Sequence, residues 1–161
     1  MPDSAAPSPT RTGLRDRYWD RIPMDEMTSA EWEALCDGCG KCCLNKLEDE
    51  ETGQVELTRV ACRLFDDTTC RCRHYETRHD YVPECIQLSP KTITTHMYWL
   101  PQTCAYRLIW EGRDLYDWHP LISGDEASVA RAGVSVRDRT ISEEDVPNED
   151  DWDDHIIEEP V

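Results

Sequence analysis

The chain of 161 residues contains a single phenylalanine and no long hydrophobic run, so it is poor in the side chains that usually fill a protein core. The longest apolar stretch near its middle, MYWLP at residues 97–101, is far shorter than the roughly 20 residues that a membrane-spanning helix needs. The N-terminus also lacks the apolar segment of a secretory signal. These absences predict a cytoplasmic protein that does not cross a membrane.

Positive charge is also scarce, because 17 Lys and Arg residues face 34 Asp and Glu residues, for a formal net charge of −17. Ten of the acidic residues lie between Glu143 and Val161, where there is no Lys or Arg. The remaining body is moderately acidic and would repel phosphate backbones and anionic lipid surfaces. The composition therefore argues against nucleic-acid and membrane partners.

Motifs of common enzyme families are missing from the sequence. It has no glycine-rich phosphate loop and no HExxH pair of zinc-binding histidines. Asp117 and His119 flank Trp118, a pattern that is more typical of a hydrogen bond within a loop than of catalysis. The sequence therefore assigns no reaction.

Cysteine, in contrast, is abundant, and four of the nine cysteines lie in the stretch CDGCGKCC at residues 36–43. In a reducing cytoplasm, such density indicates metal ligands or redox groups rather than disulfides. Cys36, Cys39 and Cys42 have the spacing C-x2-C-x2-C, which suits zinc and is also the ligand run of bacterial ferredoxins. In ferredoxins a further cysteine follows after three intervening residues. It is missing here, and Cys43 follows Cys42 at once.

Adjacent cysteines have a geometric consequence, because neighbouring side chains point in different directions. Cys42 and Cys43 therefore cannot easily occupy two corners of one zinc tetrahedron. They favour a polynuclear cluster or two neighbouring ions, unless Cys43 is simply buried. The remaining ligands are expected from the middle of the chain, where Cys70 and Cys72 would share one face of a strand. The eight candidate metal ligands are Cys36, Cys39, Cys42, Cys43, Cys62, Cys70, Cys72 and Cys85.

Two other side chains, His74 and Cys104, were further candidates for metal ligands. His74 follows Cys72 by two residues and could supply a nitrogen ligand. Cys104 falls within an expected helix and is interpreted as a small hydrophobic residue rather than a ligand.

These motifs resemble the CxxCxxCC family of YkgJ-like cysteine-cluster proteins, described as zinc- or iron-chelating domains, and most closely its YcgN-like branch. The similarity spans about residues 14–139. In the later family motif C-x-I-Y-x-x-R-P-x-x-C, the residues Cys72, Tyr75, Arg78 and Cys85 correspond, while His79 replaces the usual proline. The ligands implied by the resemblance are Cys36, Cys39, Cys42, Cys43, Cys62, Cys72 and Cys85. The resemblance implies no reaction.

The sequence thus predicts a metal-binding protein and leaves zinc and an iron–sulfur cluster open as its cofactor. The first functional hypothesis is a structural metal that compensates for a thin core. The second is an iron–sulfur protein with a redox, sensing or catalytic role. The third, a thiol oxidoreductase that uses Cys36 and Cys39, is weaker because no βαβ pattern surrounds this pair.

The expected fold is a small α-rich single domain with minor β content, irregular metal-stabilised cysteine loops and disordered termini. Residues 1–13 are expected to be disordered, 14–139 to form the cysteine-cluster domain, and 140–161 to form a disordered acidic tail that could dock a basic protein partner. Helices are predicted over 29–35, where Thr28 and Glu31 form a capping box, and over 101–112 and 125–132. A strand is predicted around 55–60.

Overall fold

The computed structural model describes residues 13–157, so nearly all of the segment 1–13 lies outside the described residues. The described chain divides into two compact units. We call residues 39–85 and 135–157 the sheet unit, and residues 13–38 and 86–134 the helical unit. Each unit is built from segments that are distant in sequence.

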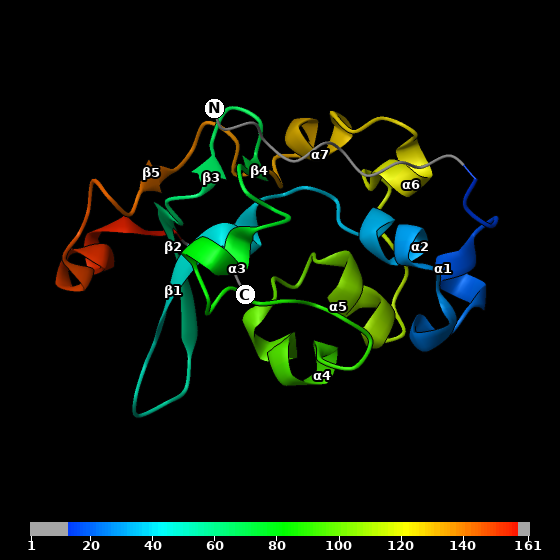
Figure 1. Cartoon of the computed structure of the whole chain (residues 1–161), viewed down its shortest axis with the longest axis horizontal. Helices are drawn as coiled ribbons and strands as arrows, with labels where there is room; N and C mark the ends of the chain where they lie inside the picture. The colour runs from blue at the N-terminus through cyan, green and yellow to red at the C-terminus, as the bar shows by residue number, and fades with distance from the viewer. Residues whose placement is uncertain (1–12, 158–161) are drawn as a thin grey trace. The chain divides into compact units, whose positions relative to one another are not determined.

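The sheet unit contains two β-sheets and a few single-turn or short helices (Figure 1). Its elements are η2 (Lys41–Cys43), β1 (Leu44–Glu48), β2 (Val55–Ala61), β3 (Phe65–Asp66), β4 (Arg71–Cys72), α3 (Arg78–Tyr81), β5 (Ile141–Ser142), η4 (Glu149–His155) and β6 (Ile156–Ile157). Strand β2 pairs antiparallel with β1 and β6 and parallel with β5, and β3 pairs antiparallel with β4. The strand predicted around 55–60 is confirmed as β2.

The hairpin of β1 and β2 is fixed by its turn and by the apolar residues on one face. The carboxylate of Asp49 accepts hydrogen bonds from the backbone N–H groups of Glu51 and Thr52, at 2.8 and 2.9 Å. Such side-chain acceptors stabilise a tight turn between strands. A small core then forms below the sheet from Leu44, Leu57, Ala61, Phe65, Cys70 and Val136.

The acidic segment after residue 139 folds back on this sheet, so the prediction of disordered termini is wrong for residues 141–157. Its last strand returns to β2, where Leu57 lies opposite Ile157 (Figure 1). Val146 is buried, and the indole N–H of Trp152 donates to its carbonyl oxygen at 3.0 Å. These apolar residues gain enough burial to order a highly charged segment. Docking of a basic partner on it stays a prediction.

The helical unit has a separate and more aromatic core. Its elements are α1 (Tyr18–Arg21), η1 (Met24–Glu26), α2 (Ser29–Ala34), α4 (Ile93–His96), η3 (Met97–Trp99), α5 (Ala105–Trp110), α6 (Pro120–Ser123) and α7 (Ser128–Arg131). The rings of Trp32 and Tyr106 pack with centroids 4.8 Å apart, and the Tyr106 hydroxyl donates to the Trp32 carbonyl oxygen. Leu35, Leu108 and Ile93 are also fully buried here.

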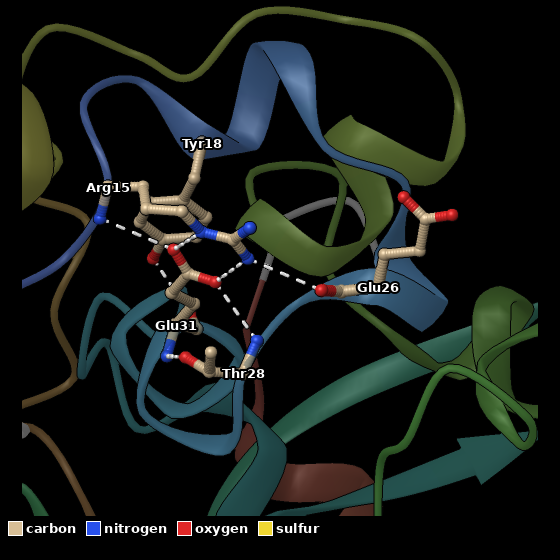
Figure 2. A network of polar contacts seen from close by, with 5 residues as sticks. All are labelled: Arg15, Tyr18, Glu26, Thr28 and Glu31. Carbon is tan, nitrogen blue, oxygen red and sulfur yellow. Dashed lines mark hydrogen bonds and ion pairs between the residues drawn. The ribbon is translucent and has the colours of Figure 1, made fainter.

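Helix α2 begins where the sequence predicted, and its first turn is anchored by a buried carboxylate (Figure 2). Thr28 accepts from the Glu31 backbone N–H, and Glu31 accepts from the Thr28 backbone N–H, so the capping box is confirmed. The Arg15 side chain also donates to Glu31, and the Tyr18 hydroxyl donates to the Glu31 carbonyl oxygen at 2.7 Å. Glu31 thereby ties the N-terminal segment to this helix.

The expected α-rich fold is wrong, because 33% of the described residues are helical and 14% are in strands, and none of the helices exceeds seven residues. The helices predicted over 101–112 and 125–132 shrink to α5 and α7. Gly112 and Gly133 end them in left-handed conformations. Among residues 13–157, no helix is long and apolar enough to span a membrane. The part of the chain that the structure describes shows no stabilisation by a metal.

Candidate metal centre

The cysteine-rich loop reaches the sheet unit through a glycine in close contact with its core. Gly40 has a φ angle of 81°, and a β-carbon placed on it would lie 2.6 Å from Sγ of Cys70 and 2.9 Å from atoms of Phe65 and Val136. After this point, η2 carries Cys42 and Cys43 directly into β1. Only glycine allows the backbone to turn here and to approach this core so closely.

Hydrogen bonds to backbone carbonyl oxygens join the cysteine loop to the cysteines from the middle of the chain. The Cys62 N–H at the end of β2 donates to the Cys43 carbonyl oxygen at 2.8 Å. The Cys70 thiol donates to the Cys39 carbonyl oxygen at 3.3 Å, and Cys70 itself has a positive φ of 60°. Cys72 lies on β4, opposite Phe65. These contacts bring the loop beside the β3–β4 hairpin.

The thiols of the sheet unit also influence one another's ionisation. The pKa of Cys43 is raised well above its ordinary value by its hydrogen bond with Cys42, by burial, and by the charges of Cys42, Cys72 and Cys62. The pKa of Cys85 is raised chiefly by burial, and also by Cys42 and Cys72. A nearby like charge disfavours ionisation of a thiol, so these shifts indicate thiols that lie near one another.

The same pattern extends to two further thiols. Burial is the largest cause that raises the pKa of Cys62, and the charges of Glu143, Cys85 and Cys72 add to it. Burial likewise raises the pKa of Cys70, and Cys42 adds to it. Six thiols, from four separate segments of the sheet unit, therefore lie within electrostatic range of one another: Cys42, Cys43, Cys62, Cys70, Cys72 and Cys85.

Two cationic side chains lie beside these cysteines. Arg78 was named from the resemblance only as a motif position without a role, and Lys46 was not singled out from the sequence. Arg78 opposes the rise in the pKa of Cys72 and Cys85, and it is held by the Tyr75 ring and carbonyl oxygen. The buried Lys46 ammonium donates to the carbonyl oxygens of Lys41 and Leu44, on either side of the cysteine pair, at 3.4 and 3.2 Å. The sequence predicted no strand at residues 44–48, so it gave no signal for Lys46, which is buried two residues after Leu44 in β1.

Cys36 and Cys104 belong to the helical unit, where both pack against its core. Cys104 precedes the first residue of α5 instead of lying inside a helix, because residues 101–104 form a turn closed by the Cys104 N–H and the Pro101 carbonyl oxygen. Seven of the eight candidate ligands lie in the sheet unit, and Cys36 does not. Its role as a ligand stays a prediction.

His74 and His119 both contact neighbouring residues of their own unit. The His74 ring packs on Tyr81, with centroids 4.5 Å apart. His119 is buried; its Nδ1 accepts from the Leu121 N–H, which leaves Nε2–H to donate to the Leu35 carbonyl oxygen at 2.7 Å. These hydrogen bonds of His119 hold α6 and the end of α2 together. The loop hydrogen bond expected from the Asp117 and His119 pattern stays a prediction.

The comparisons with known proteins agree with the cysteine pattern. Residues 35–105 match the model of the CxxCxxCC family, whose description reads "Putative zinc- or iron-chelating domain". A UPF0260 protein of Rhodobacter capsulatus is 60% identical over 148 residues, which cover 92% of this chain and 98% of that protein. The chain belongs to the UPF0260 family. This confirms the resemblance to the CxxCxxCC proteins.

Further UPF0260 proteins are similar over nearly the same length. That of Allorhizobium ampelinum is 56% identical, over 89% of this chain and 89% of its own. That of Rhizorhabdus wittichii is 55% identical, over 88% of this chain and 94% of its own. No solved structure matches this UPF0260 chain significantly.

The donor set of this UPF0260 chain fits zinc or iron in its chemistry, because both metals accept several thiolate ligands. The side chains, however, are not arranged around a common point. Within residues 13–157, no group of three or more His, Cys, Asp or Glu side chains is close enough to hold a metal ion. Sharing one ion would therefore require these sulfur atoms to lie closer together than they do in this structure.

Proposed function

We propose that this protein binds zinc or iron through the cysteine thiolates of its sheet unit. The supporting observation is that hydrogen bonds join Cys62 to Cys43 and Cys70 to Cys39. Thiols from four chain segments also affect one another's pKa. The residues proposed to hold the metal are Cys39, Cys42, Cys43, Cys62, Cys70, Cys72 and Cys85, with Cys36 as the eighth candidate.

Metal binding accounts for this cluster better than disulfide or dithiol chemistry. None of the nine cysteines forms a disulfide in the structure. Cys39 is only 8% exposed, which disfavours a thiol oxidoreductase that attacks a substrate with Cys36 and Cys39. Buried thiols ionise reluctantly when the resulting thiolates repel one another, and a bound cation offsets this repulsion. The proposed site of action is the reducing cytoplasm, where thiols stay available to metals.

The number and placement of the thiols favour more than one metal ion. A mononuclear zinc site is complete with four ligands, and the sheet unit alone has seven candidates. The adjacent pair Cys42–Cys43 would suit two ions or one polynuclear cluster. An iron–sulfur cluster with a redox, sensing or catalytic role is therefore the second candidate function. When bound, either metal would supply a positive centre that keeps the thiolates ionised.

The test is metal analysis of the protein purified without oxygen, combined with its visible absorption spectrum. We expect stoichiometric zinc in a colourless protein, or iron and sulfide in a brown one. The double variant Cys62→Ser/Cys72→Ser should lose most of the metal. Cys104→Ser, which changes a thiol of the helical unit, should keep it.

Two results would overturn the proposal. One is wild-type protein that contains only trace metal and takes up neither zinc nor iron on reconstitution. The other is equal metal loss in Cys104→Ser and in the double variant, which would mean that the sheet-unit thiols have no special part.

Because metal displaces protons from thiols of raised pKa, binding should also tighten as the pH rises toward those pKa values.

A further inference from the structure

We infer that residues 135–143, which we call the strap, are part of the metal centre, and that Glu143 is a positioning residue for Cys62. The strap lies outside residues 35–105, the region that matches the zinc- or iron-chelating family. This inference rests on the proposed function. It concerns residues that contain no cysteine and that the sequence indicated only as the end of the domain and the start of an acidic tail.

The first residues of the strap contact the cysteine loop and Cys70 together. The Val136 N–H donates to the Cys39 carbonyl oxygen at 2.9 Å, and the Ser135 hydroxyl lies 3.4 Å from the Cys70 sulfur. The Val136 side chain is buried in the core of the sheet unit, beside Gly40. One short segment thus fixes two of the cysteine-bearing stretches against each other.

The middle of the strap holds the β3–β4 hairpin. The Asp138 N–H donates to the Asp67 carbonyl oxygen at 3.2 Å, and the Thr140 hydroxyl donates to the Asp67 carboxylate at 2.8 Å. Asp67 lies in the turn that leads to Cys70. The backbone conformation of this turn, which aims Cys70 and Cys72, therefore depends on strap contacts.

The end of the strap forms hydrogen bonds with the backbone on both sides of Cys62. The Glu143 N–H donates to the carbonyl oxygen of Ala61 at 2.8 Å, and its carboxylate accepts from the backbone N–H of Arg63 at 2.9 Å. The second carboxylate oxygen accepts from the Asn45 side-chain amide at 3.2 Å. Asn45 also donates to the Val60 carbonyl oxygen. The Glu143 backbone thus holds the residue before Cys62, and the Glu143 carboxylate holds the residue after it.

These contacts matter for metal binding because ligands bind tightly only when the surrounding groups orient them. Loss of such an outer hydrogen bond lowers metal affinity typically 10- to 100-fold. The Glu143 carboxylate lies close enough to the Cys62 thiol to affect its charge. We nevertheless assign the positioning role of Glu143 to its hydrogen bond with the Arg63 N–H. Variants that keep either the charge or the hydrogen bond distinguish the two effects.

The experiment measures Co²⁺ binding to the reduced full chain, because thiolate–cobalt absorption reports the geometry around the metal. Glu143→Gln removes the charge but keeps an oxygen that can accept from the Arg63 N–H. Glu143→Asp keeps the charge but withdraws the oxygen by one methylene. We expect Gln to bind Co²⁺ like the wild type, and Asp to bind about tenfold more weakly with an altered charge-transfer band. The matched control is Glu144→Gln, which removes a charge at the neighbouring exposed position.

The results distinguish a failure of the strap inference from a failure of the proposed function. If wild-type protein binds no Co²⁺, Zn²⁺ or iron, the proposed function fails. If it binds metal and Glu143→Asp has the same affinity and spectrum as the Glu144→Gln control, the strap inference fails alone. If Gln is as damaging as Asp, charge and not position is decisive, and the positioning role is overturned. Urea midpoints of the metal-free proteins show whether weaker binding merely follows weaker folding, which would also overturn it.

Discussion

At the scale of single residues, Gly40 shows how closely the cysteine loop fits its unit. Its backbone lies in the left-handed region, and the space where a side chain would begin is occupied by Cys70, Phe65 and Val136. Gly53, in the β1–β2 turn, has a similar φ of 72° but nothing within 4 Å of the equivalent position. The two glycines therefore share a conformational requirement and differ in packing.

We predict that Gly40→Ala destabilises the sheet unit more than Gly53→Ala does. Both variants should lose about 1–2 kcal/mol from the left-handed backbone. Gly40→Ala should lose about 1–3 kcal/mol more, because the new methyl group overpacks the core beside Cys70. Urea unfolding followed by circular dichroism measures the difference. Equal losses in the two variants would mean that the loop does not pack as described.

At the scale of elements, α2 illustrates a helix whose start is set by local chemistry. The pKa of Glu31 is lowered from 4.5 to about 2, mainly by the hydrogen bond from the Arg15 side chain and further by the Thr28 N–H. Glu31 is 1% exposed, whereas the Arg15 side chain is half exposed. Figure 2 shows how these contacts meet at one carboxylate.

We predict that Glu31→Gln lowers stability at pH 7 by about 1 kcal/mol, since it weakens both the cap and the partly screened ion pair. Because the folded-state pKa is depressed, the carboxylate stabilises the fold fully above about pH 4.5, and this contribution is lost as the pH falls toward 2. The difference between wild type and variant should shrink over that range. Urea titrations at pH 7, 4 and 3 test it, and a constant difference would contradict the role given to the charge.

Other elements could be predicted only in part. The capping box and the apolar positions of β2 are local patterns, and both elements occur where the sequence placed them. The helix predicted from Pro101 begins four residues later, at Ala105, because residues 101–104 form a turn instead. Strands β5 and β6 are two residues long and have no signal of their own. They exist because β2, whose other edge pairs with β1, offers one free edge to a segment that carries Ile141, Ile156 and Ile157.

At the scale of the whole molecule, two separate cores share one chain, and the candidate ligands are divided unequally between them. Seven lie in the sheet unit, whose small core holds one aromatic residue, Phe65. The helical unit has the larger aromatic core, with Tyr18, Trp32 and Tyr106. A bound metal would therefore compensate mainly for the thin core of the sheet unit.

We predict that removing the metal from the loaded protein affects the two units differently. A ligand stabilises the folded segments that bind it, so a chelator should increase hydrogen exchange in β2 and in the β3–β4 hairpin by at least tenfold. Amides of α5 should change much less. Hydrogen-exchange mass spectrometry measures both in one sample. A uniform increase across the chain would mean that metal stabilises both units alike.

The sequence by itself indicated the class of ligand chemistry and some of the local elements. The cysteine spacing indicated metal ligation, and the capping box and the β2 pattern needed only neighbouring residues. The tertiary structure decided which thiols come together, that Cys36 belongs to a different unit, and that the acidic segment closes the sheet. Contacts such as those of Glu143 with Arg63 and of Gly40 with Cys70 join residues 30 to 80 positions apart, as the structure shows. No local pattern encodes such pairs, because they form only when the two segments fold onto the same core.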